Sequence, residues 1–283
     1  MVLDIVEGTV SKRMTLDSTS ELARLYQDAR QNELRLKRDL ETAREVQLLL
    51  LPRRAPNVRG LDLAAAYSPA LELGGDFYDF LSYGRKGLAL ALGDVCGKGT
   101  AAALLGALTI GILRAHALER GCQPGDVLAS LNDRIHAAHL DTRFVAMLYA
   151  TYDADSRRLA ISNAGNPYPL VLRDGKIDKL QVAGMPLGLL PGSQYETLSL
   201  DLQPGDVVVF ASDGILENHN GEQKAFGVDC LATAITAASR KASAQEISSS
   251  ILSATDKFIG RDPTPRDDRT VLVLRVTDAS PAG

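Results

Sequence analysis

The sequence contains no tryptophan, 5% aromatic residues and only three cysteines among its 283 residues. The cysteines (Cys96, Cys122 and Cys230) are odd in number and follow no metal-ligand spacing, which favours reduced thiols in a cytosol. No apolar run approaches the roughly 20 uncharged residues of a membrane helix, because charged residues or glycines interrupt every candidate. The first residues also lack the basic-then-apolar order of a signal peptide. We therefore expect a cytoplasmic protein with no membrane span.

Charge of one sign is not in large excess either. The chain has 31 Lys and Arg residues against 35 Asp and Glu residues, which gives a formal net charge of -4. A mildly acidic chain lacks the long-range attraction to phosphate backbones that generic nucleic-acid binding needs, so we expect no nucleic-acid partner. The composition is 45% hydrophobic and 23% charged, which is ordinary for a globular protein and excludes a disordered one.

Glycine and proline divide the chain into segments. Neither residue occurs between Ser18 and Leu51, and the first residues of that stretch, from Ser18 to Glu21, fit the capping box of a helix start. A stretch rich in proline, arginine and glycine follows, and short apolar runs begin near Leu61. We predict an N-terminal arm (1–17), a long helix (18–51), a linker (52–60), a compact domain (61–276) and a tail (277–283).

The predicted helix carries a thin apolar stripe. Its apolar residues recur at spacings of three and four, as in a heptad seam, but Asn32 and Asp39 occupy two seam positions. The helix either lies on its own domain or forms a parallel coiled coil between two copies, and we favour the coiled coil because a stripe this thin does not stabilise a long helix alone. Residues 18–51 are therefore the expected homodimer contact. The seam consists of Leu22, Leu25, Ala29, Leu36, Ala43, Val46 and Leu50.

The order of the later elements favours an α+β fold. Strand patterns occupy residues 61–67, 88–92, 144–152, 159–163, 170–173, 198–202, 207–211 and 270–276, and helical patterns occupy residues 99–117, 125–139, 228–239 and 244–259. Helices therefore come in pairs between groups of strands, and regular β-α-β alternation is not seen. This order predicts two antiparallel sheets with the helices outside them.

Several aspartates follow short apolar strands and have glycine or small residues beside them: Asp76, Asp94, Asp213 and either Asp267 or Asp268. A buried aspartate is costly unless it is paired or binds a metal. Carboxylates without a histidine or cysteine cluster are hard oxygen ligands, which prefer Mg²⁺ or Mn²⁺ to zinc or copper. A simple Asp-Gly turn is the alternative for each motif, but it does not explain why apolar strands run into the aspartates.

Six motifs in order resemble the PP2C-type (PPM) serine/threonine phosphatases of the bacterial SpoIIE/RsbU branch. They are LELGGDFYDF, LGDVCGKGTAAALL, NAGNPYPLVL, GMPLGL, VVVFASDGILENHNGEQKAFG and DDRTVLVLRV. The resemblance covers about residues 61–276, and AREVQLLLLP is similar to the helical linker that commonly precedes this domain. It implies a β-sandwich flanked by helix pairs, in agreement with the element order.

The resemblance also implies a metal-ligand set. Asp76 is similar to the family's ligand of one metal, and Asp94 is similar to the aspartate that bridges two metals. The backbone carbonyl of Val95 falls where the family uses a carbonyl ligand. Asp213 and Asp267 resemble the remaining ligands; Asp267 is preferred to Asp268 because it begins the family's pattern of an aspartate followed by a hydroxyl residue at the third position.

The expected cofactors are two Mn²⁺ or Mg²⁺ ions in one active site. Two such ions share a water, lower its pKa and leave a hydroxide directed at phosphorus. They also neutralise the phosphoryl oxygens, so phosphoryl transfer needs no nucleophilic side chain. The expected reaction is direct hydrolysis of a phosphoserine or phosphothreonine ester without a phosphoenzyme.

Three residues depart from the family pattern or leave alternatives open. Cys96 stands where the wider superfamily often has a histidine and this branch usually has serine, so we expect water rather than a side chain as the acid. Asn166 stands where the branch commonly has histidine. Lys98 could grip the substrate phosphate, but a solvated loop lysine is the simpler interpretation.

Other polar residues near the motifs are weaker candidates. Asp79 is either a partner of a metal ligand or a surface residue. His136 and His139 share a helix face but have no evident acidic or histidine partner, so we do not expect a metal there. The sequence from Gly97 to Thr100 lacks the order of a nucleotide-binding P-loop.

Two functions from different classes follow from the resemblance. The first is an active phosphatase that acts on a phosphorylated STAS-domain (anti-anti-sigma) protein in a partner-switching cascade. The alternative is a catalytically dead phosphatase fold that acts as a dimeric binding or scaffold module. The intact aspartates favour the enzyme, because a binding module has no need to keep buried carboxylates.

Overall fold

The computed structural model describes residues 2–82, 87–116, 123–138, 143–238, 242–260 and 267–278, and for residues 2–20 it describes the backbone alone. The chain forms two compact units, Met1–Val46 and Gln47–Gly283. The first unit consists of the long helix α1 without its last turn, and the second contains the remaining elements. Cys122, His139 and most of the predicted tail lie outside the described residues.

Helix α1 spans Val2–Leu50 and therefore begins well before the predicted start at Ser18. The segment before Ser18 contains one glycine, Gly8, and no proline. An isolated glycine inside a helix costs about 1 kcal/mol relative to alanine, which is too little to end a helix by itself. The capping-box sequence at Ser18 lies inside the helix and does not start it.

The second unit is a sandwich of two five-stranded antiparallel sheets. One sheet has the strand order β1-β10-β9-β6-β7, and the other has the order β2-β3-β4-β5-β8. The predicted antiparallel sandwich is thus confirmed. The strands are β1 (Leu61–Ser68), β2 (Phe77–Ser82), β3 (Gly87–Val95), β4 (Val145–Asp153), β5 (Arg158–Ala164), β6 (Leu170–Arg173), β7 (Lys176–Lys179), β8 (Leu198–Asp201), β9 (Val207–Ala211) and β10 (Arg269–Val276).

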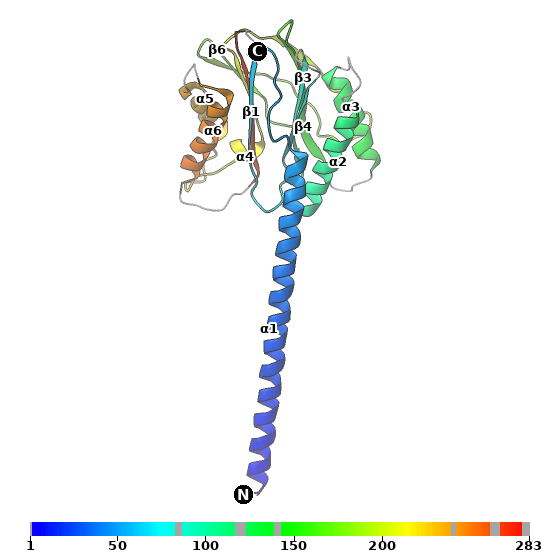
Figure 1. The fold of residues 1–283 in the computed structure, drawn as a ribbon, viewed down its shortest axis with the longest axis vertical. Helices are drawn as coiled ribbons and strands as arrows, with labels where there is room; N and C mark the ends of the chain where they lie inside the picture. Colours follow the sequence, from blue (N-terminus) through cyan, green and yellow to red (C-terminus); the bar gives the residue numbers. More distant parts are fainter. Residues whose placement is uncertain are drawn as a thin grey trace. The chain divides into compact units, whose positions relative to one another are not determined.

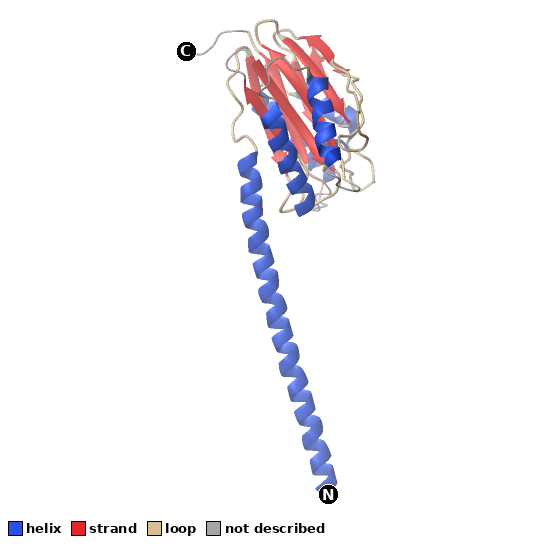
Figure 2. Ribbon diagram, turned by 90° about the vertical axis from the view of Figure 1, so that its right-hand side faces the viewer, coloured by secondary structure: helices blue, strands red, loops and turns tan. Residues whose placement is uncertain are grey.

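The larger helices of this unit cover the outer faces of the sandwich. α2 (Thr100–His116) and α3 (Pro124–Ala137) pack on the sheet that contains β3, and they lie in front of the strands in Figure 2. α5 (Gly227–Ala237) and α6 (Ala244–Ile259) pack on the sheet that contains β1 and β10, on the opposite side in Figure 1. The short helix α4 (Asp213–Leu216) follows β9 directly.

Two apolar clusters hold these layers together. The larger one fills the space between the two sheets and under α2 and α3, with Phe77, Leu92 and Phe210 among its buried members. The smaller one joins α5 and α6 to the outer face of their sheet, with Ile215 and Ile251 among its members. Strands buried on both faces read as continuous apolar runs, which is why β3 and β9 were visible in the sequence.

Three elements were missed by the sequence analysis. β2 begins immediately after Asp76, in a motif to which the sequence analysis assigned no strand. β7 has the sequence KIDK, which carries no apolar alternation, and it pairs with β6 through a hairpin. α4 has four residues, too few for any periodic pattern. Among the described residues, no helix is both long and apolar enough to cross a bilayer.

Candidate metal centre

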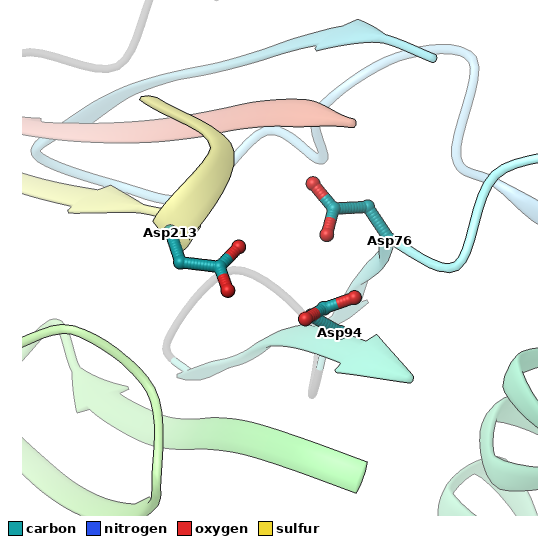
Figure 3. A group of neighbouring side chains, drawn as sticks. All are labelled: Asp76, Asp94 and Asp213. Carbon is teal, nitrogen blue, oxygen red and sulfur yellow. The ribbon is translucent and has the colours of Figure 1, made fainter. Parts of the chain in front are cut away.

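Three of the predicted aspartates meet at one end of the sandwich. Carboxylate oxygens of Asp76, Asp94 and Asp213 all lie within 4.8 Å of one another, and Figure 3 shows the three side chains directed toward a common space. Asp94 is on β3 of one sheet, and Asp213 is the first residue of α4, directly after β9 of the other sheet. The site therefore draws ligand atoms from both layers of the sandwich.

The double glycine lets the Asp76 loop lie against the end of β3. The amide of Val95 donates to the carbonyl of Gly75 at 3.3 Å. A Cβ atom added at Gly75 would lie 3.1 Å from the carbonyl oxygen of Val95 and 3.3 Å from Oδ1 of Asp94. Glycine therefore favours the close approach of the loop to Asp94, because a Cβ atom here would make tight contacts with Val95 and Asp94.

Asp76 is the most deeply buried of the three aspartates, with 2% of its surface exposed. Burial raises the pKa of its carboxyl well above the ordinary value, and the charge of Asp94 raises it further. The hydroxyl of Thr270 on β10 donates to Oδ2 of Asp76 at 2.6 Å and opposes this shift. Thr270 thus fixes the Asp76 carboxylate from the opposite sheet.

Asp94 and Asp213 are half-buried and close to other carboxylates. Desolvation, followed by the charges of Asp213 and Asp267, raises the pKa of Asp94 to about 7. Desolvation and the charge of Asp267 also raise the pKa of Asp213. Lys98 opposes both shifts. Carboxylates crowded in this way stabilise a bound cation, because a cation removes both the repulsion and the cost of burial.

The two adjacent aspartates of the last motif have different partners. Asp268 is buried, with 7% of its surface exposed. Its carboxylate accepts from the amide of Ala70 at 2.7 Å, the amide of Gly75 at 2.5 Å and the amide of Asp76 at 3.3 Å. Asp268 therefore holds the backbone of the loop that carries Asp76, and its oxygens are occupied by this loop.

Asp267 lies at the open side of the cluster. Its carboxylate is 3.3 Å from the ammonium group of Lys98, and both side chains are about half exposed (48% and 49%). Its charge contributes to the raised pKa values of Asp94 and Asp213. Asp267 thus lies outside the group formed by Asp76, Asp94 and Asp213, and its role as a metal ligand stays a prediction.

Sequence reasoning missed two groups near this site. Arg143 precedes β4, and its guanidinium lies 3.5 Å from the carbonyl oxygen of Cys96, in the loop that follows Val95. Ser212 precedes Asp213, and its hydroxyl accepts from the amide of Thr270 at 3.0 Å. No motif marks Arg143, whereas Ser212 stands directly before Asp213 in one of the six motifs, which is a signal that could have identified it.

Asp79 and Asn166 have structural partners. Asp79 is buried, so the surface alternative was wrong; its carboxylate accepts from Nε of Arg114 on α2 at 2.7 Å and from the amide of Phe80 at 2.9 Å. Asn166 is also buried and donates to the carbonyl of Leu92 on β3 at 3.1 Å. Both residues brace the elements that lead to the metal centre.

The sandwich with outer helix pairs, with an acidic cluster at one end, defines the class of PP2C-type phosphatases, whose members use divalent metals. The solved SiaA-PP2C domain of Pseudomonas aeruginosa has the same fold, with a TM-score of 0.74 and 21% identity over 86% of this chain and 98% of that chain. A structure of the PP2C phosphatase domain and a regulatory fragment of SpoIIE from Bacillus subtilis matches with a TM-score of 0.67 and 21% identity, and covers 78% of this chain and 64% of that chain.

Residues 84–277 match the family described as Stage II sporulation protein E (SpoIIE), and the chain belongs to this family. It is similar to the phosphoserine phosphatase RsbU of Bacillus subtilis (strain 168), with 29% identity over 255 residues, which are 88% of this chain and 73% of RsbU. The chain is therefore a PP2C-type (PPM) phosphatase of the SpoIIE/RsbU branch, as the motifs indicated.

Proposed function

We propose that this chain hydrolyses phosphoserine or phosphothreonine esters in a protein substrate with the help of two divalent cations. The observation that carries the proposal is the convergence of Asp76, Asp94 and Asp213, with carboxylate oxygens within 4.8 Å of one another. Three carboxylates with raised pKa values destabilise a fold unless a ligand compensates them. A binding-only module has no use for such a cluster.

The donor set fits Mg²⁺ or Mn²⁺, because it consists of carboxylate oxygens and includes no thiolate or imidazole. Asp76, Asp94 and Asp213 would hold the cations together with Asp267 and the carbonyl of Val95, and Asp94 would be shared. When bound, a pair of such ions supplies charge neutralisation of the phosphoryl group and activation of the attacking water. Asp268 keeps the loop that carries Asp76 in place, because its carboxylate accepts from three backbone amides of that loop.

Two cationic side chains lie on or beside the loop that follows Asp94 and Val95. Lys98 is paired with Asp267, and Arg143 lies over the loop that joins β3 to α2. Positive charge beside a metal centre attracts a phosphate dianion and orients it through charge-assisted hydrogen bonds. We assign these two residues to phosphate capture, and we assign no side chain as the acid for the leaving serine, a role left to water.

The names of two relatives support a phosphoprotein substrate. RsbU is named a phosphoserine phosphatase, and a solved Mycobacterium tuberculosis protein combines RsbU and RsbW domains. We infer a phosphorylated STAS-domain protein as the substrate, in a partner-switching cascade in the cytoplasm. The exposed seam of α1 supports a homodimer: Leu22, Leu25 and Leu36 are 67%, 60% and 61% exposed.

Release of phosphate from a serine-phosphorylated STAS-domain protein tests the proposal directly. Turnover should depend on added Mn²⁺, and Asp94→Asn should lower it by about two orders of magnitude or more, because the charge shared by both cations is lost. The fold should survive, since the substitution preserves volume and removes repulsion within the cluster. Near-normal turnover of Asp94→Asn at saturating Mn²⁺ would falsify the two-metal assignment. A wild-type protein that binds the substrate without releasing phosphate would support the scaffold alternative.

A further inference from the structure

The segment between β7 and β8 presents large apolar side chains to solvent near the metal centre. We call residues 183–193 the apolar loop. Its exposed residues include Met185, Leu189 and Leu190, with 43%, 45% and 51% of their surface accessible. Single exposed leucines are common on protein surfaces, but several within one short loop mark a contact surface for another molecule.

Strand pairing places this loop close to the metal ligands. Val95, next to Asp94, pairs with Val145 at the start of β4. Val145 is in turn bridged to Leu187 of the apolar loop, with N···O distances of 3.0 Å and 2.8 Å in the two directions. Two strand spacings of about 4.8 Å each put the loop backbone roughly 10 Å from the backbone of Val95.

The loop backbone is fixed in place by α3. Asn132, which is fully buried, accepts from the amide of Gly188 at 2.9 Å and donates to the carbonyl of Leu190 at 2.9 Å. Nδ1 of His136 lies 3.0 Å from the carbonyl oxygen of Gly188, and Asp133 accepts from the amide of Gly192 at 3.0 Å. Polar groups from about one turn of α3 thus hold the backbone of this loop.

Gly188 shows how tightly the loop is seated. Its φ angle is +84°, in the left-handed region that favours glycine, and an added Cβ would lie 2.7 Å from Cγ2 of Ile135 on α3. Leu187 beside it is fully buried and anchors the loop in the core. A loop whose backbone is held this firmly while its leucines point outward is preorganised for contact, which lowers the entropic cost of binding.

We propose that the apolar loop is the docking surface for the phosphoprotein substrate, so that Met185, Leu189 and Leu190 contact the apolar surface around its phosphoserine. This inference rests on the proposed function, because the occupant must bring a phosphoserine to the metal centre. A protein interface of standard size covers about 800 Å² per partner, which corresponds to a disc of roughly 16 Å radius. The backbone of Leu187, roughly 10 Å from the backbone of Val95, lies within that footprint, and Leu189 and Leu190 follow it closely in the chain. A small phosphate ester does not extend that far.

The test compares a protein substrate with a small one on the full-length chain. Leu189→Gln and Leu190→Gln together should raise KM for a serine-phosphorylated STAS-domain protein by about tenfold, because apolar anchors near an interface centre carry much of the affinity. The rise in KM should be confined to the protein substrate, and Mn²⁺-dependent hydrolysis of p-nitrophenyl phosphate should be retained. Leu108→Gln on α2 is the matched control, since Leu108 is 45% exposed, like Leu189.

The outcomes separate this inference from the proposed function. If the wild-type chain hydrolyses p-nitrophenyl phosphate but no phosphoserine protein, the proposed function fails and the docking surface fails with it. If the wild-type chain turns over the protein substrate and the double variant has an unchanged KM, the docking surface alone is overturned. An equal rise in KM for Leu108→Gln also overturns the docking surface. A double variant whose sedimentation changes while its KM does not would overturn it too, because the loop would then be a contact between two copies of the chain.

Discussion

Asp267 and Asp268 are adjacent in the sequence but contact different groups. Asp268 accepts three backbone amides of the loop that carries Asp76, whereas Asp267 is half exposed beside Lys98 and the clustered carboxylates. We expect Asp267→Ala to raise the Mn²⁺ concentration for half-maximal activity much more than Asp268→Ala does. The thermal midpoint of Asp267→Ala should change little, because an exposed side chain contributes little to stability.

Asp268→Ala should act mainly on stability. Each buried amide left without its acceptor costs about 1–3 kcal/mol, so thermal unfolding should shift down by several degrees. Metal titrations and thermal unfolding of the two variants, measured under the same conditions, separate the two roles. If Asp268→Ala has the larger effect on metal dependence and the smaller effect on the midpoint, the assignment of Asp267 as the ligand is wrong.

At the scale of elements, the last turn of α1 contacts the loop that carries Asp76. The side-chain amide of Gln47 donates to the carbonyl of Gly74 at 2.6 Å and accepts from the amide of Gly74 at 3.2 Å. Arg114, which binds Asp79, also donates to the carbonyl of Leu50 at 2.6 Å. The last turn of α1 thus contacts the loop directly before Asp76.

The seam of α1 should set the activity if two copies associate through it. Asn32 and Asp39 interrupt the seam, which predicts a marginal dimer, because polar seam residues lower stability while they fix register. Replacing both by leucine should tighten the dimer and raise the rate at low Mn²⁺, whereas Leu36→Glu and Ala43→Glu should do the opposite. Sedimentation and phosphate release on the same samples provide the measurement. A dimer affinity that shifts while the rate stays constant would make α1 a tether without a regulatory role.

At the scale of the whole molecule, the acidic cluster lies where the two sheets meet. Asp94 belongs to one sheet and Asp213 to the end of the other, so without a cation their repulsion acts across the sandwich. The pKa of Asp94 is raised to about 7, and those of Asp76 and Asp213 are also raised. Each of these carboxyls holds a proton more tightly in the folded state than in the unfolded state. The stability that the protonated carboxyls contribute to the folded state is therefore lost as the pH rises.

Metal-free protein should therefore become less stable between about pH 4, where unfolded carboxyls titrate, and about pH 7, where Asp94 titrates. Thermal unfolding in the presence of a chelator, recorded across this range, measures the effect. Asp94→Asn should flatten the profile, and Mn²⁺ at pH 7 should raise the midpoint by binding the folded state only. A midpoint that is independent of pH in the metal-free wild type would show that these carboxylates are not forced together.

Much of the architecture could be predicted because its signals are local. Continuous apolar runs predicted β3 and β9, and glycine beside aspartate at strand ends predicted Asp76, Asp94 and Asp213 as a group. Elements without a local signal were missed, such as the polar strand β7. The start of α1 was misplaced because a capping sequence near Ser18 has no effect inside a helix that continues through it.

The two antiparallel sheets, the helix pairs and the acidic residues at the strand ends could be predicted from the sequence, because strand burial and turn chemistry act over a few neighbouring residues. The contacts of individual side chains could not be predicted in this way. Asp268 contacts Ala70 across 198 positions, Gln47 contacts Gly74, and the apolar loop beside β4 is held by Asn132. Such contacts depend on which distant strands pair and on the layer in which a helix packs. The local sequence around each residue does not indicate these arrangements.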